Sequence, residues 1–379
     1  MNDVFAPATL LDLIEEYSAQ GIHRTGWPAD ERCSDWLIEW LGRNGITSQK
    51  STFRFPRLES RAAYVDVGGV RTPGIPLHDG APTSPAGVTG DLTRPSANLK
   101  GKVVVAVGQP ELPPLLETPD GARPAAVIMI TSDPEGNVLL RNGEAIDHPF
   151  DLPVIQVARR DAGPIQRALE SCKRATVVLD FKRAPGSATN VVGSIAATPG
   201  APLVVVMTPK SGWFNCAAER GGGLVITMAL AAHARQSAAR SKELLFLFTS
   251  GHEINYYGLL EHLKANTDLR DRAETWVQLG ASIGAKNQPA WRVLSRDDAL
   301  RAMTAAALER QGLGPVMLAP KDQRPSGEAR EVFDKRFVAL AGGHPYFHSP
   351  ADLPELSVDA VRVSRFGLAL REVLETLVS

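Results

Sequence analysis

One pattern dominates the second half of the chain: short apolar runs alternate with longer segments of helical character. The apolar runs LVVVM, LLFLF, TWVQL and FVALA cover residues 203–207, 244–248, 275–279 and 337–341. Helical segments follow at 223–236, after Tyr257, and at 297–312 and 357–379. Continuous apolar runs are typical of strands buried on both faces, and helices between them are typical of a largely parallel sheet. The pattern therefore predicts an α/β domain with a mixed sheet flanked by helices.

The middle third of the chain has a different character, because short β-like runs are separated there by proline and glycine from about residue 51 to 183. Strand candidates are KVVVAVG, AAVIMI, LPVIQVA and ATVVLDF, and one helix is predicted over 161–172. We predict that 56–185 is a β-rich insertion. The α/β domain would then consist of 1–55 and 186–379.

Two helices are predicted to open the chain. The first, within residues 1–20, places Leu10, Leu11 and Ile14 on one face. The second covers 29–45, with Asp30 as a candidate cap and a glycine after its end.

Bulk properties exclude several classes of protein. The formal net charge of the 379 residues is -1, and no Lys/Arg-rich run is present, so nucleic-acid binding is not expected. Cys33, Cys172 and Cys216 lie far apart, which excludes a disulfide framework and fits a reducing compartment. No apolar segment is long enough for a membrane span, and the acidic N-terminus does not match a signal peptide. We therefore expect a cytoplasmic protein without a membrane partner.

His252 and Glu253 directly follow the apolar run LLFLFTSG. In parallel sheets, sites form at the carboxyl ends of strands. Imidazole and carboxylate are both metal ligands and proton carriers, so this pair is a candidate for chemistry.

Other strand ends supply more residues of these types. The run ending at Met207 is followed by a glycine-rich loop that contains Lys210, Ser211, Cys216, Glu219 and Arg220. The run ending at Ala341 is followed by GGHPYFHSPAD, with His344, His348 and Asp352. We predict that these side chains form one site with His252 and Glu253, in which Asp352 supports the loop that carries His348.

Several stretches resemble the co-catalytic di-zinc aminopeptidases, the family that also includes glutamate carboxypeptidase and the transferrin receptor ectodomain. YFHSPAD resembles the loop with that family's last histidine ligand, SGHEINYYG its Glu-Glu step, ERGGG its bridging acid, and HRTGWPADERCSDWLIEWLGRNGI its opening segment. The middle third resembles the protease-associated insertion of many members. The resemblance implies an aminopeptidase-like fold over nearly the whole chain.

The departures from the family pattern are concentrated at the ligand positions of one of the two metal ions. Pro209 stands at the position of the first histidine ligand, Ser211 at that of the following aspartate, and Gly280 at that of a later aspartate. His252 stands where the family has its general-base glutamate. Since proline and glycine offer no side-chain donor, a two-metal mechanism is not expected.

The resemblance leaves the ligands of the other metal in place. Glu219, Glu253 and His348 would hold at most one divalent ion, with zinc the expected metal, and His252 would accept a proton from bound water. In the alternative interpretation, fixed cations replace the metal: Lys210 or Arg220 would pair with the two glutamates, and the pocket would hold no metal.

Two further residues of the loop have ordinary interpretations beside the functional ones. Ser211 beside Lys210 lacks the surroundings of an activated nucleophile and is expected to be a surface-loop residue. Cys216 would need His252 within hydrogen-bond reach to react, and is otherwise a small apolar residue.

The sequence thus predicts a divergent hydrolase of an amide or related bond in a small or peptide-like substrate, with His252 as the general base. The alternatives are a non-catalytic binding or assembly protein, and a metal-free transferase, cyclase or lyase that uses the same cleft. The sequence does not indicate an oligomeric state.

Overall fold

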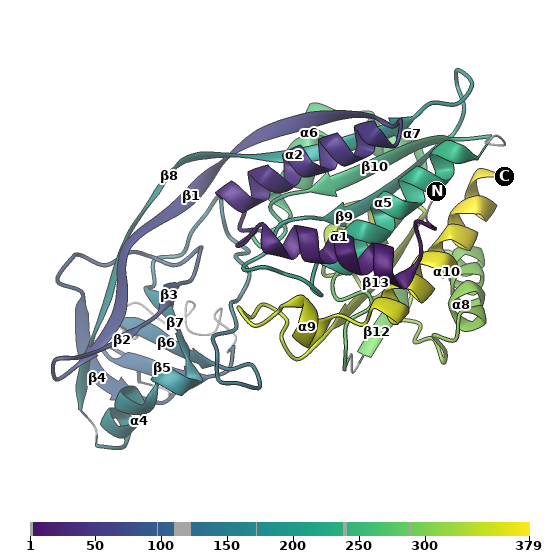
Figure 1. Cartoon of the computed structure of the whole chain (residues 1–379). Helices are drawn as coiled ribbons and strands as arrows, with labels where there is room; N and C mark the ends of the chain where they lie inside the picture. Colours follow the sequence, from purple (N-terminus) through teal and green to yellow (C-terminus); the bar gives the residue numbers. More distant parts are fainter. Residues whose placement is uncertain (1–2, 97, 110–122, 172, 238–240, 288–289) are drawn as a thin grey trace. The chain divides into compact units, whose positions relative to one another are not determined.

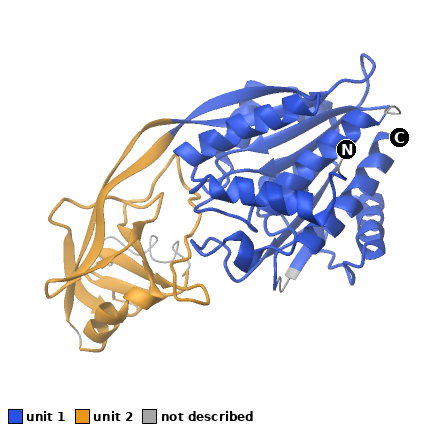
Figure 2. Ribbon diagram, in the orientation of Figure 1, with its two compact units in different colours: residues 1–55, 187–379 blue, residues 56–186 orange. Residues whose placement is uncertain are grey.

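The computed structural model describes residues 3–96, 98–109, 123–171, 173–237, 241–287 and 290–379. Cys172 lies outside these residues. The chain forms two compact units, one from residues 1–55 and 187–379 and the other from residues 56–186 (Figure 2).

The first unit contains the predicted α/β sheet, in the strand order β12-β13-β11-β9-β10-β8. Its strands are β9 (Leu203–Pro209), β10 (Glu243–Thr249), β11 (Ala273–Leu279), β12 (Ala290–Leu294), β13 (Phe337–Gly343) and the C-terminal part of β8 (Arg174–Ile195). The strands β13, β11, β9 and β10 are parallel, whereas β12 and β8 run antiparallel to their neighbours. The mixed sheet expected from the sequence is confirmed.

Both faces of this sheet are covered. Along β9, Val204 and Val206 belong to one apolar cluster, and Leu203, Val205 and Met207 to another, because successive side chains of a strand point to opposite faces. The first cluster is completed by side chains of α1 (Pro7–Ala19), α2 (Pro28–Arg43), α5 (Gly221–Gln236), α8 (Asp298–Arg310) and α10 (Ala360–Val378). The second is completed from α6 (Tyr257–Ala265), α7 (Leu269–Arg272) and the short helix η2 (Glu328–Val332). Figure 1 shows α1, α5 and α10 packed together.

The second unit has its own sheet, in the order β4-β5-β6-β7-β3. The strands are β3 (Ile75–Pro76), β4 (Val88–Thr93), β5 (Val103–Val107), β6 (Ala126–Thr131) and β7 (Val154–Ala158). The N-terminal part of β8 pairs with β4, and β1 (Thr47–Val67) forms a hairpin with β2 (Val70–Pro73). The short helix η1 (Arg159–Asp161) precedes α4 (Gly163–Glu170), which packs against the core of this unit.

Two local expectations differ from the structure. The run ATVVLDF was expected as a short strand of the insertion, but it belongs to β8, one strand from Arg174 to Ile195 that continues into the first unit. Asp30 is not the N-cap of α2, which is Trp27. The Asp30 carboxylate instead accepts a hydrogen bond from Gly26 N (2.9 Å) and is fully buried.

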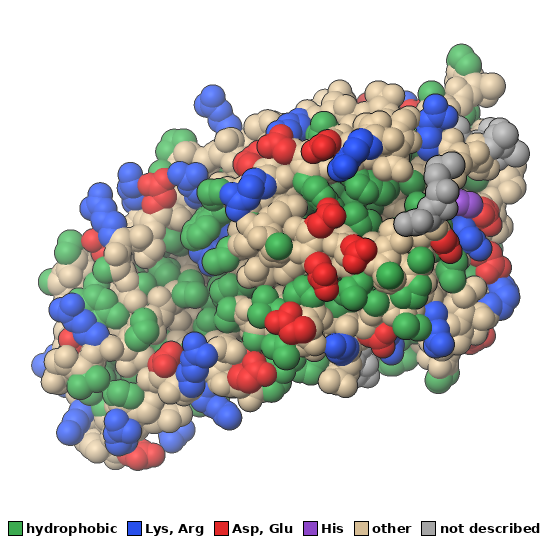
Figure 3. All heavy atoms as spheres, in the orientation of Figure 1, with side chains coloured by type: hydrophobic (Ala, Val, Ile, Leu, Met, Phe, Trp, Pro, Cys, Tyr) green, Lys and Arg blue, Asp and Glu red, His purple; other side chains and the backbone are tan. Residues whose placement is uncertain are grey.

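The surface carries both signs of charge. Lys/Arg and Asp/Glu side chains are interspersed on the face that Figure 3 shows, as the near-zero net charge suggests. No helix within the described residues has the length and apolar character needed to cross a bilayer.

Candidate active site

The loops after the parallel strands meet at one edge of the sheet, since parallel strands end on the same side. Lys210 follows β9, Ser250 to Glu253 follow β10, and Gly280 follows β11. The loop after β13 leads through His344 and His348 to α9 (Pro354–Ser357). The residues predicted from separate strand ends therefore lie at a common edge.

Lys210 is fully buried and paired with Asp30. Its ammonium group donates to both the carboxylate and the carbonyl oxygen of Asp30, the latter at 2.9 Å. Burial by itself lowers the pKa of Lys210, but the nearby Asp30 carboxylate outweighs it and the pKa is raised. Lys210 therefore contributes a buried positive charge at this edge of the sheet.

Glu253 lies at the same edge with both carboxylate oxygens occupied. Oε1 accepts hydrogen bonds from Thr25 N at 2.6 Å and Thr25 Oγ1 at 2.7 Å, and Oε2 accepts one from Ser211 Oγ at 2.7 Å. Ser211 was expected to be a surface-loop residue, but this prediction is wrong because the residue is fully buried. Its hydroxyl also accepts a hydrogen bond from Gly251 N (2.8 Å) and so holds the loop after β10 in place.

Glu219 pairs with Arg220 and faces His348. Arg220 Nη2 lies 2.7 Å from Glu219 Oε1, and His348 Nε2 lies 3.4 Å from the same oxygen. Burial raises the pKa of the Glu219 carboxyl, but the Arg220 guanidinium and then His348 outweigh it, so the pKa is lowered. The Arg220 guanidinium is itself held by Nε donating to Ser211 O at 2.8 Å.

Asp352, predicted to support the loop that carries His348, bonds instead to the backbone of the loop before α5. Its carboxylate accepts hydrogen bonds from Ala218 N and Glu219 N, both at 2.9 Å, ahead of α5. His344 Nε2 lies 3.3 Å from the same carboxylate, and His344 Nδ1 is 2.9 Å from Ser282 Oγ. His344 thus joins the loop after β13 to the loop after β11.

The partner of His252 is Glu328, which the sequence analysis did not identify. His252 Nδ1 lies 2.9 and 3.1 Å from the two oxygens of the fully buried Glu328 carboxylate. Gln278 Nε2, on β11, donates to Glu328 Oε2 at 2.8 Å. Burial raises the pKa of Glu328, but His252 outweighs it and the pKa is lowered, so the carboxylate is ionised at neutral pH.

The donor set does not fit a metal ion of the aminopeptidase type. No three His, Cys, Asp or Glu side chains in the described part of the chain form a group that could hold a metal. The predicted ligands Glu253 and Glu219 are engaged by hydroxyl groups and by a guanidinium. At Gly280, a β-carbon would lie 2.8 Å from Leu340 O, so no ligand side chain fits there without a shift.

Cys216 packs in the apolar cluster of the first unit and is buried. Its sulfur lies 3.8 Å from Glu219 Oε2. Burial first, and then the Glu219 carboxylate, raise the pKa of the thiol well above its usual value. Since the thiolate is the nucleophilic form, a thiol with a raised pKa is a poor nucleophile at neutral pH. Cys216 is therefore a packing residue of the apolar cluster.

His23 lies next to the site and supports a pH prediction. It is fully buried, its ring stacks on Tyr17 at 3.8 Å between centroids, and burial followed by the Lys210 ammonium lowers its pKa to about 3. A lowered histidine pKa favours the neutral folded form, so stability present above pH 6.5 is lost as the pH falls toward 3. The loss is about 1.4 kcal/mol per pH unit.

Unfolding in urea at pH 6.5 and 5.0 measures this loss. Between these pH values, wild type is expected to lose about 2 kcal/mol more than His23→Phe, which keeps a ring against Tyr17. His148→Phe, at an exposed histidine, is the control and should behave as wild type. Equal pH dependence in wild type and His23→Phe would contradict the prediction.

Comparison with known proteins adds the fold relationship. No family model and no curated protein match the sequence. Among solved structures, a zinc aminopeptidase from Bacillus subtilis superposes with a TM-score of 0.81 at 18% identity, over 99% of this chain and 96% of that chain. This chain has the aminopeptidase fold.

Other structures of this fold are similar as well. An aminopeptidase from Aneurinibacillus sp. strain AM-1 has a TM-score of 0.71 at 14% identity, over 98% of this chain and 94% of that chain. A glutaminyl cyclase from Porphyromonas gingivalis has a TM-score of 0.55 at 10% identity, over 99% of this chain and 100% of that chain. At these identities the similarity is one of fold, so function has to be argued from the site.

Proposed function

We propose that the chain is a hydrolase of an amide or related bond in a small or peptide-like substrate, with His252 as its general base and without a metal ion in the cleft. The observation that carries the proposal is the pair of His252 with the buried, ionised carboxylate of Glu328 at 2.9 Å. The observed sheet supports it, because sites in sheets of parallel strands form at the carboxyl ends of the strands, where His252 lies.

Glu328 is the positioning residue in this proposal. A carboxylate at Nδ1 favours the tautomer that carries its proton there and leaves Nε2 free to accept one. Within the described residues, Nε2 of His252 makes no hydrogen bond. It is therefore available to a water molecule or a substrate.

The reaction follows from that arrangement. His252 Nε2 takes a proton from water as the water oxygen attacks the carbonyl carbon of the substrate. The same proton is then given to the leaving nitrogen as the carbon–nitrogen bond breaks, so the imidazole ends neutral. The Glu328 carboxylate stabilises the imidazolium between these two steps.

Fixed cations support the metal-free form of the proposal. Lys210 and Arg220 are both buried in the loop between β9 and α5 and pair with Asp30 and Glu219. They supply positive charge where the resemblance placed metal ligands.

We also propose that residues 56–186 are an insertion of the protease-associated type.

A binding or assembly protein is the second candidate. The observation that favours it is that Lys210 and Arg220 are compensated inside the chain, which leaves a closed network at the strand ends. Cyclisation is the third candidate function, because a glutaminyl cyclase is among the proteins with a similar fold. Each of these candidates would use the loops at this edge of the sheet.

Turnover of aminoacyl and acyl anilides by chelator-treated protein tests the proposal. His252→Ala is expected to reduce kcat by about 10²- to 10⁴-fold, the usual contribution of a general base. Glu328→Gln should lower kcat and move the pH profile while KM stays nearly constant. His233→Ala, at a histidine that pairs with Glu375 on α10, is the matched control.

Three results decide between the candidates. Unchanged activity of His252→Ala would remove its role as the base. Activity that requires added zinc, with about one ion bound per chain, would overturn the metal-free form of the proposal. No turnover of any anilide by wild type would favour the binding protein.

A further inference from the structure

A pocket of about 270 Å³ lies at the edge of the sheet in the first unit, between β12, β13 and the loop before η2. We call it the β12–β13 pocket. It is lined by Arg292, Leu294, Gln323, Arg324, Pro325, Ser326, Gly327, Ala339, Ala341, Gly342 and Gly343. Among the residues that the structure describes, this lining contains two arginines and no acidic residue. Its size suits one arm of a substrate rather than a whole drug-sized ligand.

Two chain segments lead from this pocket directly to the candidate active site. Gly327 lines the pocket, and the next residue, Glu328, bonds to His252. Gly343 also lines it, and His344 follows. At Gly327, a β-carbon would lie 2.6 Å from Gln278 Nε2, the same atom that donates to Glu328. A ligand in the pocket would therefore lie beside the residues that hold the general base.

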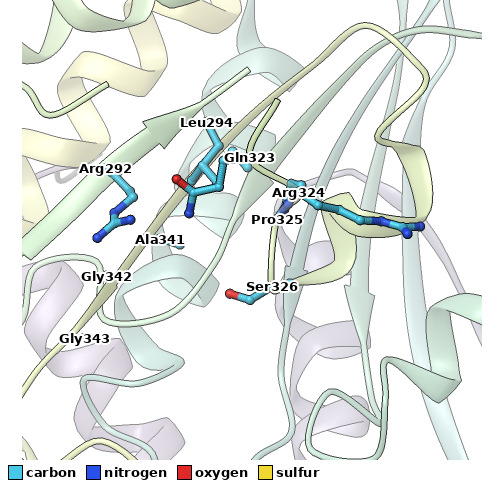
Figure 4. A pocket seen from close by; sticks show the side chains of 11 residues that line it. Arg292, Leu294, Gln323, Arg324, Pro325, Ser326, Ala341, Gly342 and Gly343 are labelled. Atoms are coloured by element: carbon cyan, nitrogen blue, oxygen red, sulfur yellow. The ribbon is translucent and has the colours of Figure 1, made fainter. Parts of the chain in front are cut away.

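The two arginines are placed differently. Figure 4 shows the side chains of Arg292, Gln323 and Ser326 on one side of the loop, whereas the guanidinium of Arg324 extends away from them. Arg292 is half-buried on β12 opposite Ala341. Neither Arg292 nor Arg324 has an ion pair or hydrogen bond within the described residues. Arg292 is thus the cation that faces the pocket, and no carboxylate of the described residues pairs with it.

We infer that the β12–β13 pocket binds a carboxylate on a short aliphatic arm of the substrate, through the guanidinium of Arg292. A planar guanidinium matches a carboxylate with two parallel N–H···O hydrogen bonds. The Gln323 amide and the Ser326 hydroxyl are further donors at the same side. Leu294, Ala339 and Ala341 offer apolar contact to the methylene groups of the arm.

This inference rests on the proposed function and names its substrate class: amides that carry a free carboxylate on a short aliphatic arm. The basic lining discriminates against neutral analogues, because a desolvated guanidinium without a partner is costly. It also discriminates against substrates whose arm carries an amine.

Calorimetric binding of glutarate to the full chain tests the inference, with glutaramide as the neutral analogue. Wild type is expected to bind glutarate. Arg292→Gln should weaken binding by about 10- to 100-fold, the usual worth of hydrogen bonds to a charged group. Arg324→Gln, which removes an equal charge from the same lining, should change the affinity by less than about 3-fold, since its guanidinium extends away. Thermal unfolding of both variants checks that they are folded.

The outcomes separate this inference from the proposed function. Equal losses in the two arginine variants, equal binding of glutaramide, or no binding of glutarate by wild type would each overturn the carboxylate site. The same titration with His252→Ala is expected to give wild-type affinity, because His252 does not line the pocket. Glutarate binding that depends on Arg292, without turnover of any carboxylate-bearing amide, would retain the site and reject the hydrolase.

Discussion

Replacing Lys210 with methionine is expected to lower the free energy of unfolding by about 3–5 kcal/mol, the usual cost of breaking a buried ion pair from one side. Lys210 and Asp30 are both fully buried. In Lys210→Met, Gly26 N and Ser250 Oγ still donate to Asp30 Oδ2, but Oδ1 loses its ammonium partner. Urea unfolding at pH 7 measures the difference.

Two further variants make this prediction specific. Adding Asp30→Asn to Lys210→Met removes the uncompensated charge, so part of the lost stability should return. Lys321→Met, which breaks the exposed pair with Asp298, is the matched control and should cost less than about 1 kcal/mol. Similar losses in the buried and exposed variants would contradict the structure.

Replacing Arg220 with methionine is expected to cost about 3–5 kcal/mol at neutral pH, because it leaves the buried Glu219 carboxylate without its main cation. Adding Glu219→Gln should recover part of that loss. Arg310→Met, at the exposed pair with Glu372, is the control and should change stability by less than about 1 kcal/mol.

The pH dependence of the Arg220 variant has a defined sign. In wild type the pKa of Glu219 is lowered, so its stabilisation is present above the ordinary carboxyl pKa near 4.5 and is lost as the pH falls through the folded pKa. In Arg220→Met, burial dominates and raises that pKa, so acid relieves the buried charge. The stability difference between the two proteins should therefore shrink below about pH 5. A constant difference would mean that Glu219 and Arg220 do not interact as an ion pair.

These two ion pairs also bear on the proposal of a metal-free site. Buried pairs of this kind are not strong evidence of net stabilisation, since a well-packed apolar pair of similar volume is often as stable. Their place at the strand ends is what matters for function. A site that carries its own fixed cations keeps its charge balance without an exchangeable ion.

The sequence by itself determined the sheet, its flanking helices and the residues at its carboxyl edge. The strands Leu203–Pro209 and Glu243–Thr249 contain the continuous apolar runs LVVVM and LLFLF, because both faces of the sheet are covered, and that pattern is local. Parallel strands end on one side, so Lys210, His252 and Glu253 were expected together without knowledge of any contact.

Only the tertiary structure decided which of these side chains meet. Glu328 bonds to His252 across 76 residues, Asp30 to Lys210 across 180, and Thr25 to Glu253 across 228. No feature of the neighbouring sequence indicates a functional role for Glu328, because the stretch around it is polar and resembles a solvated loop. A charge is neutralised by whichever group the fold brings within hydrogen-bond distance, and that distance does not depend on separation along the chain. For the same reason, the sequence left open whether a metal or a cation faces Glu219, and the packing of Arg220 against it supports the cation.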